Sequence, residues 1–438
     1  MKTEEPAGIP LHTKILIALI VGAILGISIN FLMNREGGGA LAEMLNTWIP
    51  RLITYVLEPI GQIFLRMLFM TVIPLVFASL ALGVAQLGSA GNLGRIGLKT
   101  MIYFVTTMTC AVVIGLTLVN TVKPGDGLPE DLKASLMEKF AGDAAKKTGP
   151  TDFGVQTFVN IVPRNPLKAM VEMDMLAVIC FALLIGIGLT KINKSHCASA
   201  VTLLEAINDL MVIIISWAMK LAPYGVFSLI FAVTARFGYS FLASLGWYVA
   251  VVLIGLTLQM FGVMPLLLIT MARYSPLKFF SKAKSIMITA FSTSSSNATL
   301  PTSIKVAEEE LNVPPAIAGF VLPLGATMNM NGTALFEGVT VMFLAQVFGV
   351  DLSWDRQAIV VVLSVLTAIG AAGVPGGSLP LLAMVMGTVG VPPEGIALIL
   401  GVDRILDMCR TTLNATADVI VAMCISRSEQ HHQETAKN

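Results

Sequence analysis

Charged side chains are scarce in this sequence. Asp, Glu, Lys and Arg make up 13% of its 438 residues, whereas a soluble globular domain carries about 25%. Hydrophobic residues make up 55%, and the formal net charge is only +1. The clustered basic face that a nucleic-acid-binding protein needs is therefore lacking as well. These shortages exclude a soluble domain and a DNA- or RNA-binding protein, and they predict an integral membrane protein.

Cysteine is also rare, with five residues and no CxxC spacing among them. They are Cys110, Cys180, Cys197, Cys409 and Cys424. This pattern excludes a disulfide framework and a zinc site, and we interpret the cysteines as small buried hydrophobes. The polar start, Met1 to Lys14, precedes an apolar run without a small-residue cleavage site, so no cleaved signal peptide is expected.

One apolar segment near the C-terminus, Gly401 to Asp418, carries an unusual number of polar groups. At about 100° per residue, six of them share one stripe roughly 100° wide. They are Asp403, Asp407, Arg410, Thr411, Asn414 and Asp418. Such a stripe is typical either of an amphipathic surface helix or of a membrane helix that lines a solute pathway. The overall composition favours the pathway.

Six apolar runs suit membrane helices of about 20 residues. They are Ile15 to Met33, Leu52 to Leu87, Met101 to Val119, Met175 to Thr190, Leu203 to Val233 and Phe241 to Met271. The second run contains Glu58, Arg66 and Pro74, which predicts a tilted or bent helix. A hydrophilic interval, Asn120 to Pro166, predicts a solvent-side loop. Lys and Arg concentrate in alternate links, which predicts a cytoplasmic N-terminus.

The last third contains interrupted apolar segments. Ser292 to Pro301 and Gly370 to Ser378 are bends rich in Ser, Gly and Pro, and both are typical of re-entrant hairpins. Between them, Ala316 to Phe348 carries Asn329-Met-Asn-Gly-Thr333, which predicts a helix unwound at mid-membrane. Two hairpin-plus-helix units entering from opposite faces form an inverted repeat, a device of secondary transporters. We therefore expect eight membrane-spanning helices and two re-entrant hairpins.

Four motifs carry a resemblance to a known family. They are Ser-Ser-Ser-Asn-Ala-Thr-Leu-Pro, Asn-Met-Asn-Gly-Thr-Ala-Leu, Gly-Val-Pro-Gly-Gly and Asp-Arg-Ile-Leu-Asp-Met-Cys-Arg-Thr-Thr-Leu-Asn. In this order and spacing they resemble the dicarboxylate/amino acid:cation symporter family, which includes excitatory amino-acid transporters. The resemblance covers nearly the whole chain. It implies a homotrimer in a cell membrane, with fixed scaffolds and transport domains that move like elevators.

The resemblance also implies a division of the chain. The parts are scaffold helices 1 and 2 (residues 1–88), transport-domain helix 3 (89–121), an external loop (122–167), scaffold helices 4 and 5 (168–235), transport-domain helix 6 (236–275), hairpin 1 (276–310), helix 7 (311–350), hairpin 2 (354–392), helix 8 (393–426) and a cytoplasmic tail (427–438). Both termini are then cytoplasmic.

By motif position, Arg410 resembles the arginine that binds the side-chain carboxylate of the substrate. A guanidinium suits that role because it donates two parallel hydrogen bonds to a carboxylate. Asp407 resembles the residue that binds the α-amino group. Further matched contacts are Thr333, Thr411 and Asn414, together with the backbone at Ser295, Ser296 and Val374. This set implies L-aspartate or L-glutamate as the substrate. The alternative for Arg410 and Asp407 is a structural ion pair within one helix.

The resemblance implies sodium sites as well. One would contain Asp418 with backbone at Gly325, Asn329 and Asn414, and a second would contain Thr327 with backbone of Ala368 to Ala371. A third would contain Tyr103, Thr106 and Thr107. Asn331 replaces the aspartate that sodium-coupled members usually have, so the third site is in question.

Two more departures concern coupling. Glu337 stands where proton-coupled animal members have a glutamate, and a carboxylate at that depth suits a proton carrier. We therefore expect proton coupling, with or without sodium; the alternative is a packing residue satisfied by Asn329 or Asn331. A second arginine is lacking at Ser294, Met408 and Cys409, which makes potassium counter-transport unexpected.

The sequence thus predicts a symporter of acidic amino acids and no enzyme. Three alternatives remain open: a C4-dicarboxylate symporter, a neutral amino-acid symporter, and a channel or sensor without concentrative uptake. Asp407 argues against the first, since a dicarboxylate offers it no cation. Arg410 argues against the second, because it would be buried unpaired.

Overall fold

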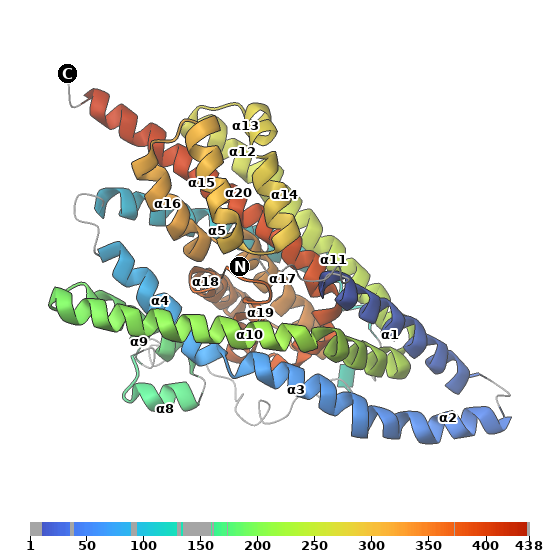
Figure 1. Cartoon of the computed structure of the whole chain (residues 1–438). Helices are drawn as coiled ribbons and strands as arrows, with labels where there is room; N and C mark the ends of the chain where they lie inside the picture. Colours follow the sequence, from blue (N-terminus) through green and yellow to red (C-terminus); the bar gives the residue numbers. More distant parts are fainter. Residues whose placement is uncertain are drawn as a thin grey trace, which may run out of the picture.

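The computed structural model describes residues 11–35, 39–88, 94–128, 133–134, 159, 162–172, 174–371 and 373–435. Every regular element in these ranges is a helix (Figure 1). Most of the predicted loop, residues 120–166, lies outside the described residues.

The helices of the first half are α1 (Leu11–Met33), α2 (Gly39–Leu52), η1 (Ile53–Leu57), α3 (Glu58–Phe69), α4 (Val72–Gly88), α5 (Gly94–Val122), α8 (Pro166–Val171), α9 (Met175–Leu189) and α10 (Lys194–Phe237). Those of the second half are α11 (Tyr239–Leu258), η3 (Gln259–Val263), α12 (Met264–Leu267), η4 (Leu268–Ala272), α13 (Pro276–Lys282), α14 (Lys284–Thr293), α15 (Ser296–Lys305), η5 (Val306–Glu310), α16 (Pro315–Met328), α17 (Asn331–Phe348), α18 (Trp354–Ile369), α19 (Leu379–Val389), η6 (Pro393–Leu398) and α20 (Leu400–Thr435).

Six helical stretches among the described residues are long and apolar enough to cross a membrane. They are Thr13–Met33, Glu43–Ala85, Arg95–Val122, Lys194–Arg236, Leu242–Ala272 and Leu400–Gln430. Two apolar helices, Ala177–Leu189 and Leu379–Thr388, are shorter. The interrupted segments Ile286 to Val306, Ala316 to Phe348 and Ile369 to Val391 are not among the six, because the chain breaks inside them.

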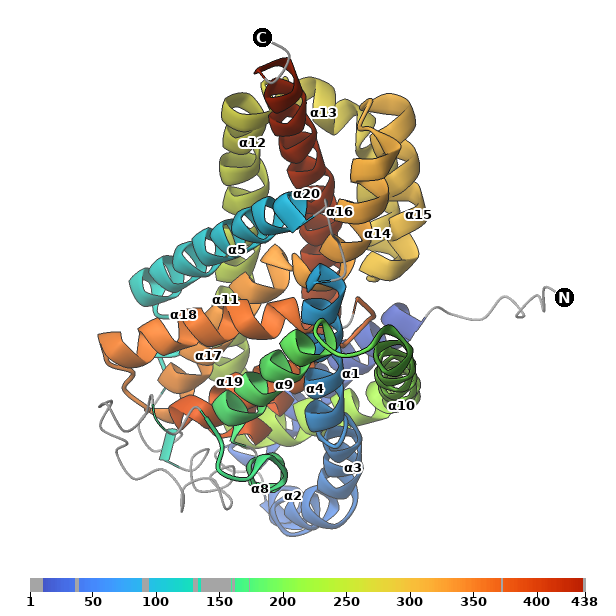
Figure 2. The ribbon, with the colours of Figure 1, turned by 90° about the vertical axis from the view of Figure 1, so that its left-hand side faces the viewer.

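The helices pack in two groups (Figure 2). In the first group the long α10 lies against α1, α3 and α4, and α9 packs on α4. In the second group α20 contacts α14, α15, α16 and α17, while α5 packs along α17 and against α11 and α18. The C-terminal helix with the polar stripe is thus surrounded by the interrupted segments of the last third.

The predicted bend in the second apolar run is confirmed. Helix α3 ends at Phe69 and α4 begins at Val72, and the Thr71 hydroxyl donates to the carbonyl of Leu68 at 2.7 Å. The predicted ends are less accurate. This stretch is already helical from Gly39, and α20 continues to Thr435, past the expected end at residue 426. Polar helix ends extend beyond the apolar run, so hydrophobicity alone underestimates their length.

The interrupted segments fold as helix pairs at the predicted positions. Helices α14 and α15 pack together and are separated only by Ser294 and Ser295. Ser294 adopts the left-handed conformation (φ 49°, ψ 35°), which allows this sharp reversal. Helices α18 and α19 also pack together, and residues 370–378 join them. The break between α16 and α17 falls at Asn329 and Met330, inside the predicted motif.

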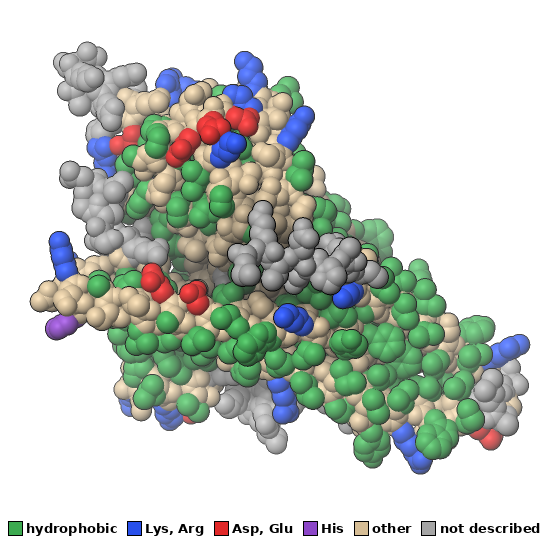
Figure 3. Space-filling model, viewed as in Figure 1, with side chains coloured by type: hydrophobic (Ala, Val, Ile, Leu, Met, Phe, Trp, Pro, Cys, Tyr) green, Lys and Arg blue, Asp and Glu red, His purple; other side chains and the backbone are tan. Residues whose placement is uncertain are grey.

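Hydrophobic side chains cover much of the outer face over α10, α1 and α3 (Figure 3). On α10, Leu203, Leu210, Trp217 and Tyr224 are each more than half exposed, and they recur every seven residues on one face. A face of this kind suits lipid contact. The interpretation of the cysteines as buried was wrong for Cys110, which is exposed on α5; only Cys424 is buried. In a membrane protein the outer surface is also apolar, so a cysteine in an apolar segment can be exposed there.

Close packing of α1 on α10 depends on a glycine. A Cβ on Gly26 would lie 2.0 Å from the Thr234 hydroxyl and 2.9 Å from the carbonyl of Phe231. We expect Gly26→Ala to lower the thermal unfolding temperature in detergent, since overpacking costs about 1–3 kcal/mol. The control is Gly246→Ala on α11, where nothing lies within 4 Å. Equal unfolding temperatures for the two variants would contradict this close contact.

Candidate functional site

The polar stripe of α20 is buried. Asp403, Asp407, Arg410, Asn414 and Asp418 are each at most 7% exposed. An amphipathic surface helix would show these groups to water, so that alternative is wrong. Helices α14 to α17 cover the stripe instead, and they bring it against the bends of the last third.

Arg410 lies at the centre of this arrangement and is 1% exposed. Its Nη2 is 2.9 Å from Asp407 Oδ1 and 3.0 Å from Asp403 Oδ1. Its Cζ lies 3.7 Å from the ring centroid of Phe336, a cation–π contact between α20 and α17. Its Nε and Nη1 have no hydrogen-bond partner among the described residues. Nη2 of the guanidinium is therefore paired, whereas its other two nitrogens are not.

Arg410, Asp403 and Asp407 form a charge group, and Asp407 connects it to the bend between α18 and α19. Its Oδ2 accepts a hydrogen bond from the backbone N–H of Gly376 at 3.3 Å. The same oxygen lies 3.5 Å from Nη1 of Arg404. The ion pair that was the alternative interpretation of Arg410 and Asp407 is thus present, and Asp407 also contacts a second arginine and the bend.

The break between α16 and α17 forms another wall. The Asn414 side chain accepts from the N–H of Gly332 at 2.7 Å and donates to the Thr333 hydroxyl at 3.3 Å. A Cβ on Gly332 would lie 2.7 Å from the carbonyl oxygen of Arg410. Only glycine therefore permits α17 to approach α20 this closely.

The two bends touch each other. The Ser295 hydroxyl donates to the carbonyl of Gly373 at 2.6 Å, and the N–H of Asn297 donates to the same oxygen at 3.3 Å. Where these bends meet α17 and α20, a cavity of about 20 Å³ remains. It has room for about one water molecule. Its lining includes Ser294, Ser296, Thr333, Val374, Asp407, Thr411 and Asn414.

The structure thus brings the predicted substrate residues together. Ser296, Thr333, Val374, Asp407, Thr411 and Asn414 line one cavity, Ser295 lies at its edge, and Arg410 is bonded to Asp407. The charge group was predicted only in part. Arg404 was missed because it lies outside the 100° stripe, although it is three residues from Asp407.

A chain of side-chain amides lies beside this cavity. The Asn329 side chain donates to Asp418 Oδ1 at 2.9 Å, and the Asn331 side chain donates to Asn329 Oδ1 at 2.8 Å. Gln259 donates to Asn331 at 3.2 Å and to the carbonyl of Thr107 at 3.0 Å. Gln259 is fully buried and was not predicted. Its signal was a lone amide in the apolar run from Phe241 to Met271.

Asp418 lies against the backbone of α16, because a Cβ on Gly325 would be 2.5 Å from its Oδ1. Gly325, Asn329, Asn331 and Asp418 therefore lie together, with Asn414 on the same face of α20. Carboxylate, amide and backbone oxygens are the ligands that hard cations prefer. Among the described residues, no group of three His, Cys, Asp or Glu could hold a metal ion, so a transition-metal centre is not indicated there.

The remaining predicted ion residues are placed less uniformly. Thr327 and Ala371 line a separate cavity of about 300 Å³ with Glu205 and Asp209 of α10. Thr107 is buried, and its hydroxyl lies 3.5 Å from Asn329 Oδ1. Tyr103 is half-buried, whereas Thr106 is exposed on α5. The structure therefore joins Thr107, but not Thr106, to the amide chain.

Glu337 is fully buried on α17. Its Oε2 lies 2.5 Å from the hydroxyl of Thr367 on α18, and its Oε1 has no partner among the described residues. The alternative that Asn329 or Asn331 satisfies this carboxylate is wrong, because those amides bond to one another and to Asp418 and Gln259. Thr367 was missed because it lies on a different helix.

Multiple membrane-length helices around buried, converging polar bends define a multi-pass membrane transport protein. The sequence model of the sodium:dicarboxylate symporter family matches residues 11–428, and the chain belongs to this family. It is therefore a cation-coupled symporter and not an enzyme.

Curated relatives agree with this assignment. A proton/sodium-glutamate symport protein of Bacillus subtilis is 36% identical over 426 residues, covering 96% of this chain and 92% of the relative. A proton/glutamate-aspartate symporter of Escherichia coli is 33% identical, with 95% and 92% covered. A C4-dicarboxylate transport protein of Deinococcus deserti is 32% identical, with 85% and 84% covered. These relatives are thus named for the transport of acidic amino acids or of dicarboxylates.

The amide chain makes a testable link between α11 and α17. We expect Gln259→Met to lower the unfolding temperature, because it leaves buried partners unsatisfied at a cost of about 1–3 kcal/mol. The control is Leu258→Met, at an exposed neighbouring position. Thermal unfolding in detergent distinguishes them, and a Gln259→Met protein as stable as the control would contradict a structural role of the amide.

Proposed function

We propose that this protein takes up L-aspartate or L-glutamate together with protons, with or without sodium. The proposal rests above all on the buried Arg410. Its Nε and Nη1 have no partner among the described residues, and burying such donors without a partner is costly. A substrate carboxylate would accept a hydrogen bond from Nη1, and a second, parallel one from Nη2 when that nitrogen turns from the aspartates to the substrate.

The rest of the substrate fits the remaining contacts. The α-amino group would bind Asp407, and Thr411 and Asn414 would supply further polar contacts. The α-carboxylate would lie at the bends near Ser295, Ser296 and Val374. An acidic amino acid then balances the charge, because it presents an anion to Arg410 and a cation to Asp407.

Substrate entry requires movement. A cavity of about 20 Å³ is far too small for an amino acid, and the Ser295–Gly373 contact closes it. We propose that the bend at residues 370–378 opens as a gate. The two groups of helices support the further proposal of a fixed scaffold and a mobile domain. We also propose a homotrimer whose protomers have eight spans, two re-entrant hairpins and cytoplasmic termini.

Proton coupling is assigned to Glu337. The Thr367 hydroxyl has one proton but lies within hydrogen-bond distance of Glu337 Oε2 at 2.5 Å and of the carbonyl of Leu363 at 2.7 Å. When it donates to Leu363, the contact with Glu337 needs a proton on the carboxyl group. Thr367 thus supports a neutral, protonated Glu337 in this closed arrangement.

Sodium is assigned to the group around Asp418. An all-oxygen environment is available there. It consists of this carboxylate and the backbone carbonyl oxygens of Gly325, Asn329 and Asn414. The amide chain through Asn331 and Gln259 carries no charge, which supports fewer sodium ions than a family member with aspartate at position 331.

A C4-dicarboxylate is the second candidate. Asp407 is already hydrogen-bonded to Arg410 and to the N–H of Gly376 and lies 3.5 Å from Arg404, so it has partners without a substrate cation. A dicarboxylate transport protein is among the relatives. Under this alternative Asp407 would hold the arginines in place.

Uptake into proteoliposomes separates the two candidates. We expect labelled L-aspartate or L-glutamate to accumulate, driven by a proton or a sodium gradient imposed separately, and succinate not to accumulate. Asp407→Asn should weaken amino-acid uptake by about tenfold or more, because a charge-assisted contact of 1.5–3 kcal/mol is lost. Succinate accumulation that Asp407→Asn leaves intact would favour the dicarboxylate candidate. Accumulation driven by neither ion would contradict a symporter.

Glu337→Gln tests proton coupling. In the unmodified protein we expect uptake to rise as the external pH falls, because protonation of Glu337 must accompany substrate entry. The glutamine is permanently neutral, so the variant should lose this pH dependence. Glu309→Gln, at an exposed position, is the control and should retain it. An unchanged pH profile in Glu337→Gln would remove Glu337 from the proton pathway.

A further inference from the structure

A groove of about 770 Å³ lies between α5 and α18, away from the substrate cavity. Its lining includes the apolar side chains of Val113, Leu116 and Val361. Lys123, which follows α5, also lines the groove. Val113 precedes it by ten residues, which is about 15 Å along the helix axis. The groove therefore runs lengthwise along the two helices.

The polar side chains in the groove are occupied by the protein itself. Thr117 and Thr121 donate to carbonyls one turn back on α5, at 2.7 Å and 2.6 Å. Asn120 donates to Gln357, which in turn donates to the carbonyl of Leu352, at 2.8 Å and 2.9 Å. These walls offer few free polar groups to a solute, and an alkyl chain suits them better.

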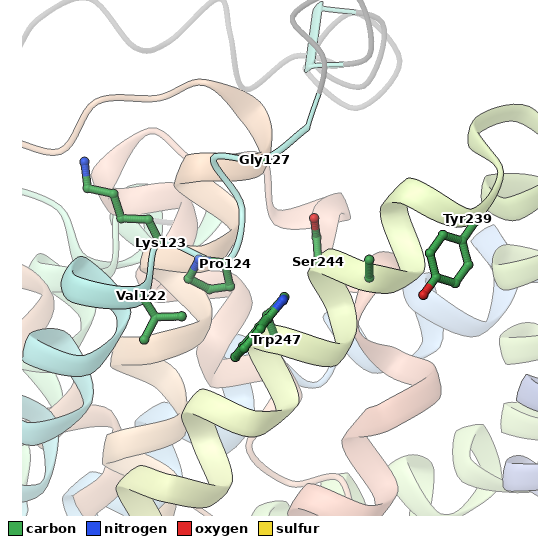
Figure 4. Close-up of a pocket in the computed structure, with 8 residues that line it drawn as sticks. Val122, Lys123, Pro124, Gly127, Tyr239, Ser244 and Trp247 are labelled. Atoms are coloured by element: carbon green, nitrogen blue, oxygen red, sulfur yellow. The ribbon is translucent and has the colours of Figure 1, made fainter.

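The end of the groove near Lys123 carries exposed tryptophan side chains, which are typical of a membrane–water interface. Trp354 lines it and is 82% exposed. In the adjoining cavity, of about 580 Å³, Trp247 lies opposite Val122 and Pro124, with Lys123 extending away from it (Figure 4). Exposed tryptophans of this kind gather at the headgroup level of a bilayer.

Both signs of charge line that end. Lys123 supplies an ammonium group whose side chain is 61% exposed and lies 3.6 Å from Asp126. Asp351, in the link between α17 and α18, supplies a carboxylate. A headgroup that carries both a phosphate and an ammonium group complements this pair.

We propose that the groove between α5 and α18 is a binding site for phosphatidylethanolamine. One acyl chain lies against Val113, Leu116 and Val361, the phosphate faces Lys123, and the primary ammonium donates hydrogen bonds to Asp351. A choline headgroup has no N–H to donate, so the site discriminates between the two zwitterionic lipids. A lipid held here braces α18, the helix that carries Thr367.

Tryptophan quenching tests the site without a transport assay. A variant with Trp48→Phe, Trp217→Phe and Trp247→Phe retains Trp354 alone. In nanodiscs, lipids brominated near the top of the acyl chain should quench Trp354 about twofold more as phosphatidylethanolamine than as phosphatidylcholine, because only the former donates to Asp351. A matched variant that retains only Trp48 on α2 should show equal quenching by both lipids.

Three substitutions locate the effect. Asp351→Asn should abolish the preference for the ethanolamine lipid, and Ala358→Phe should remove it by filling the groove. Val362→Phe, on the exposed face of α18 but outside the groove lining, is the matched control and should preserve it. Equal quenching of Trp354 by both lipids in the otherwise unmodified variant would overturn the proposal. The proposal would also be overturned if the preference for phosphatidylethanolamine remained in both Asp351→Asn and Ala358→Phe.

Discussion

The burial of one arginine among carboxylates constrains the rest of the structure. Arg410 is almost completely enclosed, and removing an ion from water costs several kcal/mol unless close partners replace the hydration. Asp403, Asp407 and the ring of Phe336 supply these partners. Because Asp407 is also bonded to Gly376, the charge group is connected to the bend that closes the cavity. A change in the ion pairs of Arg410 therefore affects the hydrogen bond between Asp407 and Gly376 in this bend.

Broken helices make this arrangement possible. An uninterrupted helix uses its backbone N–H groups internally, whereas the break before α17 leaves the N–H of Gly332 free to bond with Asn414. The carbonyl of Gly373 likewise accepts from both Ser295 and Asn297 at the other bend. Polar backbone at such a depth is tolerated because protein surrounds it. The serine- and glycine-rich motifs thus provide hydrogen-bonding groups where side chains alone would be too bulky.

The amide chain and Glu337 both involve α17, through Asn331 and Glu337 itself, and they differ in charge. Asn329, Asn331 and Gln259 are neutral and satisfy one another, with Asp418 at one end. Glu337 instead has one close hydroxyl partner and one oxygen without a described partner. The two groups therefore share a helix, and no hydrogen bond between described residues connects them.

The sequence by itself determined the membrane class, the positions of the breaks and the stripe on α20, because hydrophobicity, helical period and Gly, Ser and Pro usage are local properties. It placed Asp407, Arg410 and Asn414 on one face correctly, since residues three and four apart on a helix are neighbours. It did not reveal that Thr367 contacts Glu337, that Gln259 completes the amide chain, or that Arg404 joins Asp407. It also missed the polar ends of the helices and the exposure of Cys110. Those features depend on which helices become neighbours and on which face meets lipid. Only the tertiary structure decided them, because contacts between residues far apart in the chain leave no periodic signal in the sequence.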